Sequence, residues 1–195
     1  MVERCRQKEL TRTRILDEAA RAIREQGAGG IGVAALMQRA GLTHGGFYAH
    51  FENRDDLIAM AFERMRTDSR EMLRRNLDTQ DGADGLDRLI DDYLSDRMMH
   101  RIEASCPLPL LSQEARRLPP AARSALSDTI DNFRRRLIET LTELGRPSPS
   151  TLADSVVAEL VGAMTLARAM DDEESAMRLL EASRLELKRR AGLIP

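Results

Sequence analysis

The chain has 195 residues, of which 42% are hydrophobic, and only two of them are cysteines. This length buries a core without disulfides, and so few cysteines are typical of a reducing compartment, so we expect a cytoplasmic protein. No apolar run approaches the ~20 residues of a membrane span, so no membrane partner is expected. The formal net charge is −2, but residues 1–54 hold nine Lys and Arg against six Asp and Glu. The positive end is therefore the N-terminal end.

The composition predicts an all-α fold of about nine helices. Tryptophan is absent, aromatic residues make up 3% of the chain, and apolar positions recur at helical spacing without alternating β-branched runs. Clusters of glycine and proline divide the chain into its helices.

The expected helices run in chain order from residue 7 to 26, where Gly27 ends the first, then over 33–39 and 44–50. Asn53 is a good N-cap for a long helix that reaches Leu77. The remaining helices are expected over 84–101, 107–117, 120–144, from Thr151 to Met170 and from Glu173 to Ala191.

Two short helices joined by a glycine-containing turn and packed on an amphipathic first helix predict a helix-turn-helix, whose second helix enters the major groove. Here the second helix contains Gly45 and Gly46. Two glycines cost about 2 kcal/mol relative to alanines, but they allow another backbone to come close. Thr43 is expected to cap this helix.

The aromatic residues of the same segment divide into two groups. Phe47 and Phe51 are four residues apart and are expected to anchor the helix in a small core. His44, Tyr48 and His50 are then left facing outward.

The segment VAALMQRAGLTHGGFYAHF (33–51), followed by NRDDL (53–57), resembles the signature of the Tet-repressor family of regulators. The resemblance covers about residues 10–60. It implies a helix-turn-helix domain over 1–52 and a larger helical domain for ligand binding and dimerisation over 53–195. Gly32 replaces the family's usual Ser or Thr cap of the second helix and is a weaker cap.

The resemblance implies a protein without catalytic activity that binds a palindromic double-stranded DNA operator as a repressor and is released by a small-molecule effector. The implied DNA-binding residues lie in and around the helix-turn-helix. They are Thr11, Arg12, Thr43, His44, Gly45, Gly46, Tyr48, His50 and Arg54. The preceding segment 4–8, expected to be a disordered arm, is a further candidate for phosphate contacts.

The last two helices are expected to form a homodimer interface, because apolar residues such as Val156 and Leu160 alternate with the small residues Ala158 and Gly162. The effector site is expected among the middle helices. Its candidate residues are Tyr93, Arg97, Met98, Phe133 and Met164. Core filling explains the methionines equally well.

Other chemistries find less support in the sequence. His44 and His50 match no usual zinc spacing, His100 stands alone, and no nucleophile–base pair or phosphate loop is evident, so neither metal nor cofactor is expected. Cys106 precedes Pro107, which is suited to open a helix, so a thiol activated at an N-cap is a second hypothesis: a repressor that senses electrophiles or oxidants. A small buried cysteine is the alternative interpretation.

Overall fold

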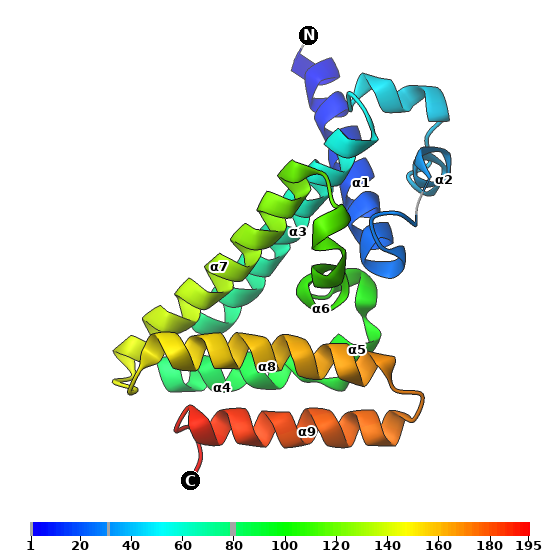
Figure 1. The fold of residues 1–195 in the computed structure, drawn as a ribbon. Helices are drawn as coiled ribbons and strands as arrows, with labels where there is room; N and C mark the ends of the chain where they lie inside the picture. The colour runs from blue at the N-terminus through cyan, green and yellow to red at the C-terminus, as the bar shows by residue number, and fades with distance from the viewer. Residues whose placement is uncertain (1, 31, 79–80) are drawn as a thin grey trace. The chain divides into compact units, whose positions relative to one another are not determined.

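A computed structural model describes residues 2–30, 32–78 and 81–195, which form nine α-helices and three short 3-10 helices and contain no strand (Figure 1). The all-α prediction is therefore confirmed. The chain folds into two compact units, one of Met1–Thr67 with Ile102–Ser127 and the other of Asp68–Arg101 with Asp128–Pro195. The unit that holds the helix-turn-helix therefore runs past residue 52 to Thr67 and also includes a segment from the middle of the chain.

The first unit is built on α1 (Val2–Gln26). Its predicted apolar face is confirmed, because Ile15, Ala19 and Ile23 are buried. Gly27 ends the helix with a φ of 77°, which favours glycine. The disordered arm was a wrong prediction: α1 begins at Val2, so segment 4–8 is its first part.

The remaining elements of the first unit are short, apart from two long helices, α3 (Arg54–Leu77) and α7 (Pro120–Glu143), that continue into the second unit. Asn53 caps α3 as predicted, since its Oδ1 accepts a hydrogen bond of 2.9 Å from the Asp56 N–H. The short elements are α2 (Val33–Arg39), η1 (His44–Ala49), η2 (Ile102–Ala104), α6 (Leu108–Leu111) and η3 (Ser112–Arg117). The single helix expected over 107–117 is thus two elements, α6 and η3.

The second unit contains α4 (Gly82–Tyr93), α5 (Asp96–His100), α8 (Pro149–Ala169) and α9 (Glu173–Arg190). The prediction of a single helix over 84–101 is wrong, because the helix is interrupted between α4 and α5. Ser95 is the reason: its hydroxyl accepts a hydrogen bond of 3.1 Å from the Met98 N–H and starts a new helix.

The helices α8 and α9 lie side by side in the second unit (Figure 1). Lys188 of α9 forms ion pairs of 2.8 Å with both Asp87 and Asp91 and so ties α9 to α4. By length and composition alone, α8 could cross a membrane, but the core helix of a soluble protein passes the same test. Val156 and Leu160, expected on a dimer surface, are buried within the chain's own core.

Candidate nucleic-acid interface

The predicted recognition helix is the 3-10 helix η1 rather than an α-helix. Thr43 occupies the N-cap, but its side chain makes no capping hydrogen bond, contrary to prediction. Its carbonyl instead accepts a hydrogen bond of 3.0 Å from the Gly46 N–H, which closes the first turn. A Cβ added to Gly45 would meet no atom within 4 Å. Packing within the chain therefore does not explain glycine at this position, and the bare backbone stays accessible to a partner.

Two phenylalanines hold η1 in place as predicted. Phe47 and Phe51 are 1% and 3% exposed, and their rings stack with centroids 5.4 Å apart. Tyr48 lies between them in sequence but is 70% exposed, with its ring edge-on to those of His44 and Phe47. The helix therefore presents the Tyr48 side chain to solvent while two buried phenylalanines hold the helix on the core.

Basic side chains from α1 lie beside the end of η1. The Arg12 guanidinium lies 5.6 Å from the centre of the Phe51 ring, and its Nη2 contacts Met60 Sδ. Burial lowers the pKa of His50, and the charges of Lys8 and Arg12 lower it further. The charges of Lys8 and Arg12 give this end of η1 a local positive potential, which suits a phosphate.

The polar groups of two other predicted contact residues make hydrogen bonds within the chain. The Thr11 hydroxyl donates to the Gln7 carbonyl within α1, at 2.9 Å. Arg54 is half-buried and donates to the carbonyl of Ala28, in the loop after α1, instead of extending freely toward a phosphate. The Ala28 N–H donates in turn to Glu114 at 2.9 Å. Arg54 therefore holds the loop that precedes the helix-turn-helix.

The five candidate effector residues do not share one environment. Tyr93, Phe133 and Met164 are fully buried, and the rings of Tyr93 and Phe133 lie 5.8 Å apart. Met98 is half-buried. Arg97 is 64% exposed and pairs with Asp92 at 3.2 Å, so its side chain is not buried as those of Tyr93, Phe133 and Met164 are.

The structure changes the interpretation of three further residues. Cys106 is buried, and Pro107 rather than Cys106 is the N-cap of α6, which has only four residues. Cys5 is exposed on α1. His100 does not stand alone, because Asp96 and Glu173 lie next to it. The four-residue spacing of Asp96 and His100 was a signal present in the sequence, whereas nothing there indicated Glu173.

Comparisons with known proteins agree with this geometry. Residues 15–61 match the family model of bacterial regulatory proteins, tetR family. An uncharacterized HTH-type transcriptional regulator of Mycobacterium tuberculosis is 28% identical over 171 residues, which are 83% of this chain and 86% of that protein.

Solved structures share the fold over nearly the whole chain. A TetR transcriptional regulator from Chloroflexus aurantiacus is 25% identical with a TM-score of 0.82, over 94% of this chain and 95% of the other. The reduced form of E. coli NemR is 21% identical with a TM-score of 0.81, over 92% and 95% of the two chains. Residues 15–61 thus form a helix-turn-helix of the tetR family of bacterial regulatory proteins, and the chain as a whole shares the fold of these transcriptional regulators.

Proposed function

We propose that this regulator binds a palindromic DNA operator as a homodimeric repressor and that a small-molecule effector releases it. The observation that carries the DNA-binding part is η1, where the exposed Tyr48 and the bare backbone of Gly45 rest on the buried Phe47 and Phe51. A recognition element must present contacts outward from a rigid base, and η1 meets this requirement.

Within this proposal the residues around η1 have different tasks. Thr43, His44, Gly45 and Gly46 lie against base edges or the groove floor, and Tyr48 and His50 contact the sugar-phosphate backbone. Thr11 and Arg12 flank these contacts, with Arg12 also packing on Phe51. Arg54 acts indirectly, since its hydrogen bond to the Ala28 carbonyl positions the loop before α2.

The homodimer is proposed to form through α8 and α9. Because Leu160 is buried, the interface must use the opposite face of α8, where Ala158, Gly162 and Leu166 retain exposure. Leu166 is 58% exposed, and Leu185 on α9 is 44% exposed. Exposed leucines beside small residues favour close packing with a second helix pair, which gives a four-helix bundle across a two-fold axis.

The effector is proposed to bind in the second unit, near Tyr93, Phe133, Met98 and Met164. To release the operator, the effector must bind more tightly to the dimer when the spacing of its two recognition helices does not fit the operator than when it does. Cocrystallisation with effector candidates, followed by operator titrations with and without each bound compound, tests this part. A bound compound that leaves operator affinity unchanged contradicts it.

The DNA-binding part is tested with tag-free protein and an operator selected from random duplexes, by fluorescence anisotropy. Tyr48→Ala removes one hydrogen bond of about 1–1.5 kcal/mol per half-site, so the dimer should bind about 30- to 150-fold more weakly. The salt dependence should remain, because tyrosine neutralises no phosphate. Arg97→Ala, an exposed change in the other unit, is the control. Wild-type affinity of Tyr48→Ala contradicts the assignment of η1.

Thiol sensing through Cys106 remains a second proposal, supported by the fold shared with NemR, a protein described in a reduced form. Because Cys106 is buried, it can react only when the segment around it opens. In a Cys5→Ser background, maleimide should label Cys106 without denaturant and release the operator. Labelling that requires denaturant, or that leaves operator binding intact, makes Cys106 a packing residue.

A further inference from the structure

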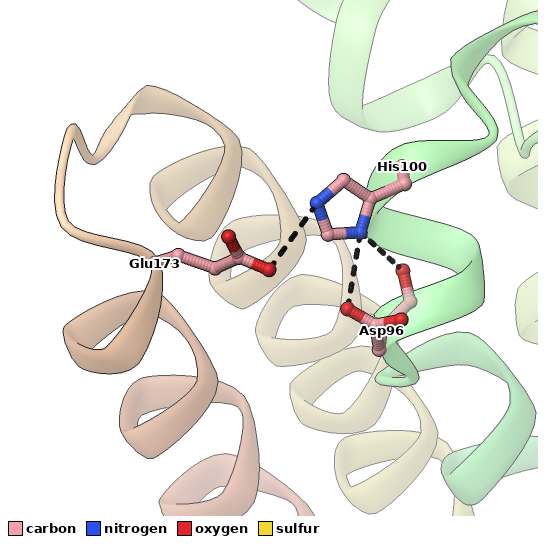
Figure 2. A group of neighbouring side chains, drawn as sticks. All are labelled: Asp96, His100 and Glu173. Carbon is pink, nitrogen blue, oxygen red and sulfur yellow. Dashed lines mark hydrogen bonds and ion pairs between the residues drawn. The ribbon is translucent and has the colours of Figure 1, made fainter.

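Three side chains of the types that can bind metal ions lie together on the surface of the second unit (Figure 2). Asp96 and His100 are four residues apart on α5, and Glu173 is the first residue of α9. His100 Nδ1 lies 3.0 Å from Asp96 Oδ1, and His100 Nε2 lies 3.6 Å from Glu173 Oε1. One ligand atom from each residue falls within 4.8 Å of the others.

The backbones that carry these side chains are held by residues outside the cluster. Arg168, at the end of α8, donates to the carbonyls of Met98 and Met99 on α5, at 2.6 and 3.2 Å. At the start of α9, Asp172 accepts a hydrogen bond of 3.0 Å from the Ser175 N–H. Since α9 begins four residues after α8 ends, Arg168 fixes α5 beside the first turn of α9.

The side chains themselves retain freedom to rearrange. Asp96, His100 and Glu173 are 62%, 53% and 69% exposed, and one ring nitrogen of His100 faces each carboxylate. A single ion therefore requires one carboxylate to swing toward the other ring nitrogen, and the exposure leaves room for this rotation. The nearby Arg178 is engaged by Glu174 at 2.6 Å and does not pair with Glu173.

We propose that Asp96, His100 and Glu173 bind one divalent transition-metal ion of the Zn²⁺ class, which links α5 to α9. Two carboxylates supply negative charge, and the imidazole favours Zn²⁺ over Mg²⁺ and Ca²⁺, which prefer oxygen ligands. Three protein ligands leave a further coordination position for water. This site is separate from the DNA-binding surface and does not depend on the proposed function.

The test is isothermal titration of tag-free protein with ZnCl₂, in a Cys5→Ser background that removes the exposed thiol. We expect one ion per protomer and no binding of MgCl₂ at the same concentrations. Mutating a residue that only orients a metal ligand lowers metal affinity by about 10- to 100-fold, and removing a ligand itself should cost at least as much. We therefore expect His100→Ala and Glu173→Gln each to weaken Zn²⁺ binding by about 10- to 100-fold or more. As the control, His44→Ala removes an exposed histidine from the other unit and should bind Zn²⁺ with the same affinity as the Cys5→Ser parent.

Hydrogen exchange provides a second measurement that does not depend on the variants. Zn²⁺ should slow exchange of the amides of α5 and of the first turn of α9, and circular dichroism should show that each variant stays folded. The proposal is overturned if Zn²⁺ affinity is unchanged in His100→Ala, if less than one ion binds per protomer, or if protection appears elsewhere instead.

Discussion

Gly162 offers a sharp test of how α8 is used. A Cβ added at this position meets no atom within 4 Å in the chain itself. Gly162→Ala should therefore stabilise α8 by about 0.5–1 kcal/mol, since glycine is the poorer helix former. Gly162→Phe should also fold as a protomer. In the dimer, however, the added ring would overpack the interface at a cost of about 1–3 kcal/mol in association free energy, and a two-fold interface contains the position twice. The sum of about 2–6 kcal/mol predicts a dimer that dissociates about 30- to 20,000-fold more readily.

Sedimentation equilibrium over a range of protein concentrations measures this change, with circular dichroism as the check on folding. Ala121→Phe introduces the same side chain at an exposed position on α7 and should leave the dimer intact. If Gly162→Phe folds and dimerises with the affinity of the wild type, this face of α8 is not the interface. If it fails to fold, the space beside Gly162 is not open, and the premise is refuted.

Three further predictions concern stability. Phe47→Ala should cost about 3–5 kcal/mol in urea unfolding, because the ring is 1% exposed; a loss below 1 kcal/mol would contradict its role as an anchor. The pKa of His50 is lowered in the folded state, so the unfolded state takes up the proton first, and stability should fall as pH drops below about 6.5; His50→Gln should flatten that part of the pH profile. Burial works to lower the pKa of Lys188, but its hydrogen bonds to two aspartates outweigh burial and raise it. Lys188→Met should therefore cost about 1 kcal/mol at neutral pH, and this difference from wild type should shrink as pH rises above about 10.4; a constant difference would refute the ion-pair explanation.

The sequence by itself determined the order of the long helices and the place of the helix-turn-helix. These features follow from local rules: Gly27 ends α1 through its positive φ, Asn53 caps α3, and Phe47 and Phe51 recur at the spacing that places both in the core. Each depends on residues within a few positions of one another, which is the range at which backbone geometry and capping act.

Only the tertiary structure decided which partners each side chain meets. Arg54 finds the Ala28 carbonyl 26 positions away, and Glu173 comes beside His100 because Arg168 joins α8 to α5. Likewise, Leu160 is buried in the chain's own core, although periodicity alone does not tell an internal neighbour from a second copy. Burial and ion pairing depend on the elements packed nearby, and the sequence encodes these only through the fold as a whole.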